Sequence, residues 1–180
     1  NGAGKSTLIK CLTGVYEPEE GEVLIGGENA MKNKALFDKI AYVPQEIDLF
    51  GYMSVAENLF IPYEKSGIKG TVSQKEIEER AIPILEKFSI PVKPNELVKD
   101  ISISSQQLLQ IARATVHEDY EVLMLDEPTT SLTSRDTEIL FDIVEKIRKE
   151  NKAIIFISHK LEEIFQLADV ITVFRNGKKV

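Results

Sequence analysis

The chain has 180 residues, of which 22 are Lys or Arg and 29 are Asp or Glu, so its formal net charge is −7. A hydrophobic fraction of 43% is typical of a folded globular protein and argues against a disordered chain. The acidic balance argues against nucleic acid as a partner, and no apolar run reaches the roughly 18 residues that a membrane span needs. The single cysteine, Cys11, excludes an intramolecular disulfide.

Short apolar runs alternate with helical patterns along the chain, which predicts an α/β layer structure. The first part of the sequence predicts a helix over residues 5–13, a strand over 22–25 that enters a hairpin, and a strand over 40–43. After about residue 46 the predicted secondary structure changes: helical patterns dominate and no convincing strand is present.

The alternation returns in the last third of the chain. Three buried strands are predicted there, over residues 122–125, 153–157 and 170–174. Between them lie a helix that Ser134 is expected to cap and a helix over 161–167. We therefore expect one domain, in which an α/β lobe over 1–45 and 116–180 is interrupted by a helical subdomain over about 46–115.

The chain opens on a glycine-rich segment that leads into a helix: Asn1, Gly2, Ala3, Gly4, Lys5, Ser6 and Thr7. These residues supply the end of the phosphate-binding pattern G-x-x-x-x-G-K-[ST] and the threonine after it. Lys5 can reach the β- and γ-phosphates of ATP, and the Ser6 hydroxyl can bind Mg²⁺. A glycine-rich turn that only enters a helix is the alternative. Because the first glycine of the pattern and the strand before it are absent, we expect the domain to be N-terminally incomplete.

Two acids and a histidine follow the predicted strands of the last third. Asp126 and Glu127 come at the carboxyl end of the strand at 122–125, the edge where α/β sheets bind ligands. Asp126 suits a Mg²⁺ contact through water, and Glu127 can polarise a water in line with the γ-phosphate. His159 follows the strand at 153–157 and could hold the γ-phosphate or that water. Ordinary strand-end acids and a structural histidine are the alternatives.

In combination, these motifs resemble the nucleotide-binding subunit of an ABC transporter. Residues 1–7 correspond to Walker A, Gln45 to the Q-loop, residues 125–129 to Walker B, residues 131–133 to the D-loop, and His159 to the switch histidine. The resemblance implies an α/β fold: a P-loop NTPase (RecA-like) lobe with an ABC antiparallel β portion and an inserted helical subdomain. It also implies ATP hydrolysis with Mg²⁺, in which Gln45 would bind Mg²⁺ or water at a hinge. A polar residue that only closes a strand is the alternative for Gln45.

The signature motif departs from the family pattern. Aligning the helix at residues 106–114 places residues 101–105 at the signature, where family members read Leu-Ser-Gly-Gly-Gln. Ser102 is retained, but Ser104 replaces a glycine and Ser105 replaces the glutamine. A shift by one residue would align Gln106 with that glutamine and break the match downstream. The resemblance implies that this segment contacts the ATP held by a second domain, so we expect that site to be weakened.

Several segments resemble, within the family, the importers of simple sugars: residues 43–46, 53–60, 157–165 and 173–177. The resemblance implies a second nucleotide-binding domain, in the same polypeptide or as a homodimer, with membrane-spanning permease subunits and, indirectly, a solute-binding protein. It places the chain peripherally at the cytoplasmic face of the cell membrane. A soluble ABC ATPase acting on ribosomes or DNA is the alternative, but the basic linkers or coiled coil that it predicts are not seen. A small-molecule kinase would leave Gln45 and His159 unexplained.

Overall fold

The computed structural model describes residues 4–61, 73–116 and 119–180. Within these residues the helices are α1 (Lys5–Leu12), α2 (Val55–Leu59), α3 (Gln74–Lys87), α4 (Ile103–Thr115), α5 (Ser134–Lys149) and α6 (Leu161–Leu167), with 3-10 helices at Lys34–Lys39 and Val98–Asp100. The strands are β1 (Leu24–Ile25), β2 (Glu28–Asn29), β3 (Ile40–Val43), β4 (Val122–Asp126), β5 (Ala153–Ile157), β6 (Phe174–Arg175) and β7 (Lys178–Lys179). In the part of the chain described, no helix is both long and apolar enough to cross a membrane.

The central sheet has three parallel strands in the order β3-β4-β5. Its register pairs Val43 with Leu125 and Leu125 with Phe156, so the three strands end level with one another. The middle strand is the apolar run that the sequence predicts to be buried, and its central residues have no solvent exposure. The loops that follow all three strands therefore leave the sheet at one edge.

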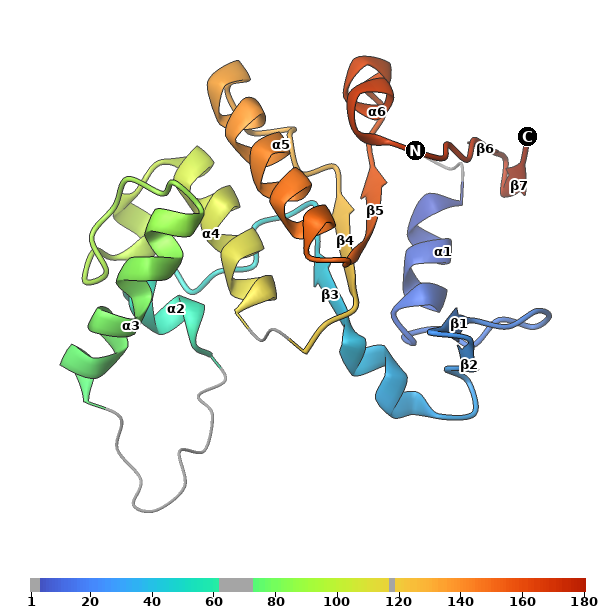
Figure 1. Cartoon of the computed structure of the whole chain (residues 1–180), viewed down its shortest axis with the longest axis horizontal. Helices are drawn as coiled ribbons and strands as arrows, with labels where there is room; N and C mark the ends of the chain where they lie inside the picture. Colours follow the sequence, from blue (N-terminus) through green and yellow to red (C-terminus); the bar gives the residue numbers. More distant parts are fainter. Residues whose placement is uncertain (1–3, 62–72, 117–118) are drawn as a thin grey trace.

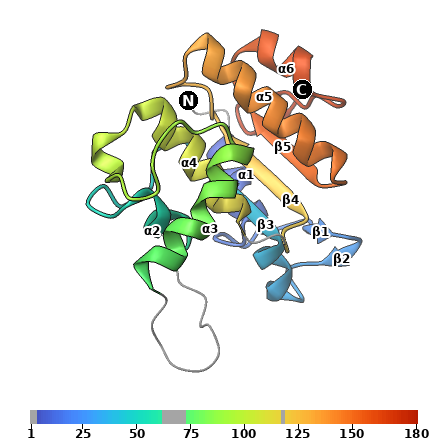
Figure 2. The same cartoon turned by 60° about the vertical axis from the view of Figure 1, so that its left-hand side comes forward.

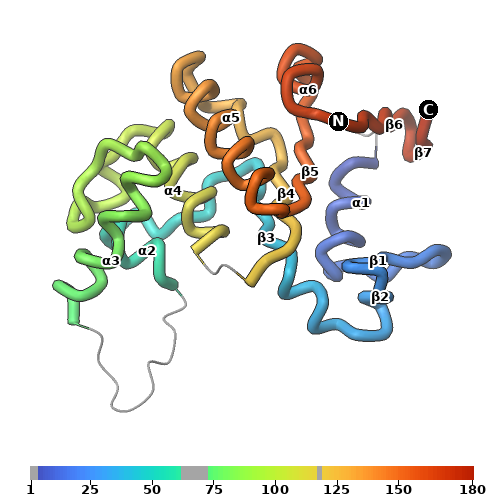
Figure 3. The backbone as a smooth tube through the Cα atoms, in the orientation of Figure 1, coloured from blue at the N-terminus to red at the C-terminus, as the bar shows by residue number. Residues whose placement is uncertain are grey.

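The helical segment between β3 and β4 packs beside the sheet instead of extending it. Figure 1 shows α2, α3 and α4 together at one end of the molecule, with the β1–β2 and β6–β7 hairpins at the other end. The tube in Figure 3 follows the chain from β3 into this helical group and back to β4. Figure 2 shows α5 and α6 on the same side of the molecule, away from α2 and α3. Parallel and antiparallel strands with an inserted helical group are the architecture that the sequence predicts.

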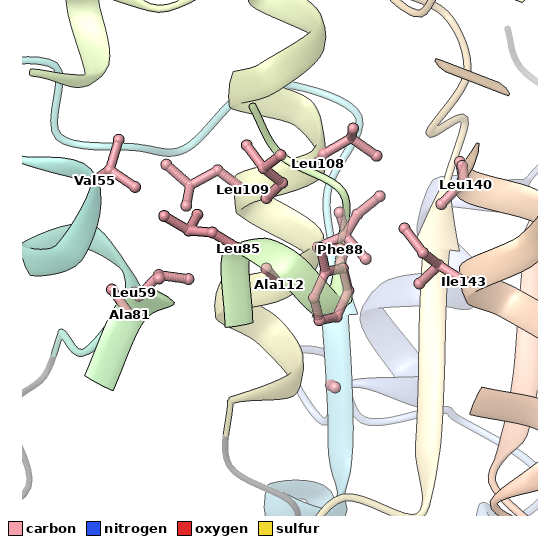
Figure 4. Close-up of a cluster of buried hydrophobic side chains, with 14 of the residues drawn as sticks. Val55, Leu59, Ala81, Leu85, Phe88, Leu108, Leu109, Ala112, Leu140 and Ile143 are labelled. Carbon is pink, nitrogen blue, oxygen red and sulfur yellow. The ribbon is translucent and has the colours of Figure 1, made fainter. Parts of the chain in front are cut away.

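One apolar core joins the helical group to the sheet. Leu108, Leu109 and Ala112 of α4 lie in the middle of the cluster in Figure 4, next to side chains of α3, with α2 to one side and α5 to the other. Phe141 of α5 meets Phe156 of β5 edge to face, with 6.2 Å between the ring centroids. Because α4 contributes to both parts of this core, the position of its N-terminus is linked to that of the sheet.

Two predictions about local structure are wrong. Ser134 does not cap α5: it is the first helical residue, and Thr133 is the N-cap because its hydroxyl accepts from the Asp136 N–H at 3.2 Å. The predicted buried strand at 170–174 is reduced to β6, which pairs only with β7 in a hairpin. Val170 is 84% exposed and Val173 is 56% exposed, so the apolar run is not matched by burial in the structure.

Candidate functional site

The loops at the carboxyl edge of the sheet bring together side chains that are far apart in sequence. Gln45 follows β3, Glu127 follows β4, and His159 follows β5, as the sequence predicts. Lys5 reaches the same place from the first turn of α1. The sheet register is the physical reason, because parallel strands that end level deliver their following residues to one edge.

Glu127 is the residue on which the other three converge. Its Oε1 accepts from Lys5 Nζ at 2.9 Å, while its Oε2 lies 3.2 Å from His159 Nδ1 and accepts from Gln45 Nε2 at 3.4 Å. The Glu127 side chain is 12% exposed, and that of His159 is 62% exposed. The hydrogen bond from Lys5 is the main reason that the pKa of the Glu127 carboxyl lies below its ordinary value, against the effect of burial. Glu127 is therefore an ionised carboxylate at neutral pH.

The backbone at Glu127 is strained. Its φ of +48° lies in the left-handed region, which costs a residue with a side chain roughly 1–3 kcal/mol. Three hydrogen bonds hold it there: its N–H donates to the Ile157 carbonyl at 2.8 Å, and its own carbonyl accepts from the N–H and hydroxyl of Thr130 at 3.3 and 3.0 Å. This turn carries the carboxylate toward Lys5 and His159.

Asp126 is the partly buried neighbour of this carboxylate. Burial, and next the charge of Glu127, raise the pKa of Asp126, while Lys5 and a hydrogen bond from Tyr42 oppose the rise. A cation beside Asp126 would favour its ionised form, so the residue suits a Mg²⁺ contact. Among the described residues no group of three or more His, Cys, Asp or Glu could hold a metal alone. Asp126 and Glu127 are two carboxylates at this edge of the sheet, and Mg²⁺ typically binds through one or two carboxylates together with water and phosphate oxygens.

The glycine-rich segment is described only from Gly4 onward; Asn1, Gly2 and Ala3 lie outside the described residues. Gly4 precedes α1 with a φ of +93°, where a side chain would be strained and its Cβ would lie 3.0 Å from the Gly177 Cα. Ser6 and Thr7 are exposed on the first turn of α1. The helix start therefore leaves the Ser6 hydroxyl open to a ligand.

The residues of the signature segment lie at the N-terminus of α4 and not at the Glu127 cluster. Ser102 is exposed and caps α4, where its oxygen accepts from the Ser105 N–H at 3.1 Å. Gln106 is turned back into the helical group, because its amide donates to the carbonyls of Val98 and Ile101. Hydrogen bonds from Thr133 and then Ser104 hold the pKa of Asp136, at the start of α5, below its ordinary value. In the described part of the chain, no hydrogen bond joins this segment to Glu127.

The residues that support the Gln45 loop were not predicted. Gln110 of α4 donates its amide to the carbonyls of Pro44 and Glu46 at 3.0 and 3.2 Å, and its oxygen accepts from the Asp48 N–H at 2.5 Å. The loop is thus held on both sides of Gln45 by one fully buried side chain. The signal available in the sequence is a glutamine between Leu109 and Ile111, where the apolar face of the helix should continue.

Comparison with known proteins identifies the family. A sequence profile described as ABC transporter matches residues 1–130 of the chain. The chain belongs to the ABC transporter family. A relative in Burkholderia cenocepacia, whose name describes a ribose/galactose/methyl galactoside import ATP-binding protein, is 42% identical over 100% of this chain and 35% of the relative. A ribose import ATP-binding protein of Agrobacterium fabrum is 40% identical over 100% of this chain and 36% of its own length. The chain thus spans about a third of these relatives.

Solved ABC structures share the fold. An ATP-binding subunit of an ABC transporter superposes with a TM-score of 0.79 at 25% identity, over 98% of this chain and 72% of the other. A dimeric ATP-binding cassette bound to ADP and Pi gives a TM-score of 0.80 at 23% identity, over 97% of this chain and 78% of the other. The predicted fold class, an ABC-type P-loop NTPase, is confirmed.

Proposed function

We propose that this chain is the ATP-binding and ATP-hydrolysing part of an ABC importer for simple sugars. The observation that carries the proposal is the convergence of Lys5, Gln45 and His159 on the Glu127 carboxylate at the carboxyl edge of the sheet. Such a group combines a cation for phosphate with an ionised carboxylate that can act on a water molecule.

The phosphates of ATP bind first in this scheme. In this proposal the backbone N–H groups of Gly2, Ala3 and Gly4, with those at the start of α1, donate to the phosphate oxygens; Asn1 and Thr7 flank this segment in the sequence. Lys5 exchanges its contact with Glu127 for the β- and γ-phosphates. That exchange needs only a rotation of a flexible side chain, because Lys5 is bound to Glu127 at the same edge.

Hydrolysis follows from the carboxylate that Lys5 releases. Glu127 polarises a water in line with the γ-phosphate, and His159, whose Nδ1 lies beside its Oε2, holds that water or the phosphate. Ser6, Asp126 and Gln45 would hold Mg²⁺. When bound, Mg²⁺ supplies positive charge that offsets the charge developing on the transferred phosphoryl group. The low pKa of Glu127 keeps the acceptor ionised at neutral pH.

The partners and the substrate extend the proposal beyond this chain. The names of the relatives describe import of ribose, galactose or methyl galactoside, which supports a simple sugar as the transported substrate. Membrane-spanning permease subunits, a second nucleotide-binding domain and a solute-binding protein complete the assembly, with this chain peripheral at the cytoplasmic face. The helical subdomain over about 46–115 is its inserted part, and 1–45 with 116–180 form the catalytic lobe.

The signature segment acts on the ATP of the second domain. Ser102 offers its hydroxyl to that γ-phosphate, with Ser104, Ser105 and Gln106 around it at the N-terminus of α4. The side chain of Ser104 limits the approach of the backbone to phosphate. Replacing Ser104 by Gly should therefore raise the turnover of the assembled transporter. An unchanged or lower ATPase rate counts against this role.

The test is ATP hydrolysis and sugar uptake by the full-length protein reconstituted with its permease subunits and its solute-binding protein. We expect hydrolysis in the wild type, loss of ATP binding in Lys5→Met, and ATP binding without turnover in Glu127→Gln. Glu121→Gln is the matched control, because it removes an exposed carboxylate that pairs with Lys39 before β4. Hydrolysis that persists in Glu127→Gln would remove the catalytic role, and vesicles that take up no labelled ribose or galactose would remove the sugar assignment.

A further inference from the structure

Glu163 is a buried carboxylate that the proposed mechanism does not use. It lies in the first turn of α6 and is 7% exposed, whereas the preceding residue, Glu162, is exposed to solvent. An acid is seldom buried unless its oxygens are paired. The partners of Glu163 therefore explain why the position is a carboxylate.

Three side chains bind the two oxygens of Glu163. Its Oε2 accepts from the hydroxyls of Thr129 and Ser158, each at 2.9 Å, and its Oε1 accepts from Lys160 Nζ at 3.0 Å. Burial raises the pKa of this carboxyl, but the hydrogen bonds from Thr129, Lys160 and Ser158 outweigh that effect and leave the pKa below its ordinary value. The carboxylate is thus charged and fully engaged.

These partners stand immediately beside the residues of the site. Ser158 and Lys160 flank His159 in the chain, and Thr129 is two residues after Glu127. The flanking residues are also joined to one another, since the Lys160 N–H donates to the Ser158 hydroxyl at 3.0 Å. Thr129 is 2% exposed, so its end of the network is as closed to water as the carboxylate itself.

We propose that Glu163 is a positioning residue for the reaction, which holds the His159 loop and the turn after Glu127 at a fixed separation. The proposal rests on the proposed function, because it assigns a role to a neighbour of those two residues. Its basis is geometric: one carboxylate binds both flanks of His159 and the segment that leaves Glu127. Lys160 Nζ also donates to the carbonyl and hydroxyl of Thr129 at 3.4 and 3.2 Å, so Glu163 completes a network that joins the two segments and supports the 3.2 Å approach of His159 Nδ1 to Glu127 Oε2.

Glu163→Gln in the full-length protein is the primary test. The variant keeps the shape of the side chain and removes the charge that three donors share. We expect kcat for ATP hydrolysis to fall on the order of 10- to 100-fold, because small displacements of catalytic groups have effects of that size. The KM for ATP should change less than about threefold, since Lys5 and the glycine-rich segment are untouched. Glu162→Gln, an equal loss of charge on the same turn, should behave as wild type.

A double-mutant cycle separates positioning from general loss of structure. Because Glu163 acts through His159 as well as through the turn after Glu127, Glu163→Gln should cause a smaller further fall in kcat when His159 is already Ala. The same loss in both backgrounds would overturn the proposal. A KM that rises in step with the fall in kcat would overturn it too, as would a Glu163→Gln enzyme with wild-type kcat.

A second pair of variants decides the matter where Glu163→Gln does not fold or His159→Ala has no measurable turnover. Thr129→Val removes one hydroxyl from the network at nearly constant volume, and Thr129→Ser keeps it. We expect Thr129→Val to have a lower kcat than wild type and Thr129→Ser to have a kcat close to that of wild type. Equal rates for Val and Ser would refute the role of the network. A wild-type protein that hydrolyses no ATP would instead refute the proposed function itself.

Discussion

ATP must displace Glu127 from Lys5, and this competition predicts that Glu127→Gln binds nucleotide more tightly than wild type. In the structure the Lys5 ammonium lies 2.9 Å from the Glu127 carboxylate. Every nucleotide that takes Lys5 as a phosphate ligand must first break this pair. A neutral amide at position 127 leaves the Lys5 ammonium available, so nucleotide binding no longer includes the free-energy cost of breaking the Lys5–Glu127 pair.

The size of the effect follows from the distance and the exposure. Two unit charges 2.9 Å apart attract by about 1.4 kcal/mol at the dielectric constant of water and by about 6 kcal/mol at an effective value of about 20. The Lys5 side chain is 32% exposed, so solvent screening and the cost of desolvation bring the net value toward the lower end. We expect a gain of about 1 kcal/mol, which lowers Kd about fivefold.

Titration calorimetry with ADP measures this gain without hydrolysis and without a γ-phosphate near the carboxylate. The gain in Glu127→Gln should shrink as salt rises, because the Lys5–Glu127 pair is partly exposed. Glu121→Gln, which removes an exposed charge before β4, should leave the Kd for ADP unchanged. A Kd that is equal to or weaker than wild type in Glu127→Gln would refute the reasoning.

Three further predictions concern stability. Asn58→Ala should lower the free energy of unfolding, measured in urea, by about 3 kcal/mol. The buried Asn58 amide donates to the carbonyls of Phe50 and Ser54 and accepts from the Phe50 N–H, and the substitution removes these three hydrogen bonds. Asn33→Ala, at an exposed position, is its control. Gly14→Ala should cost more than Gly21→Ala, since both need a positive φ but only the Gly14 Cβ would meet the Phe37 ring, at 2.7 Å; equal melting temperatures would contradict this. Lys5 lowers the pKa of Glu127 below its ordinary value, so the stability that the pair adds is fully present above the pKa of the unfolded chain and is lost as the pH falls through the folded pKa. The difference in unfolding free energy between wild type and Glu127→Gln should therefore vanish in acid, and a difference that grows there would reverse the assigned sign.

The sequence was sufficient for the parts of the fold that local patterns determine. The strands at 40–43 and 153–157 are apolar runs closed by polar or turn residues, and both are present as predicted. Parallel strands deliver their following residues to one edge, so the meeting of Gln45, Glu127 and His159 could be expected without coordinates. The apolar run at 170–174 was predicted in the same way, but only its last residue lies in a strand of the structure. An apolar pattern indicates that a segment favours burial. A strand in a sheet also needs a neighbouring strand to pair with its N–H and carbonyl groups, and the apolar pattern does not show which strand that is.

The precise arrangement of the site depends on contacts that no local pattern contains. The left-handed turn at Glu127 costs free energy on its own, and it persists because surrounding groups determine it from several sides. Its N–H is bound by the Ile157 carbonyl, 30 residues later in the chain, and the segment after it is bound through Thr129 by Glu163. Each of these partners becomes a neighbour only once β4 and β5 have paired. The orientation of the carboxylate that the sequence predicts to be catalytic therefore depends on the assembled sheet. The residues that fix this orientation occupy positions that periodicity assigns to an ordinary strand, helix or loop.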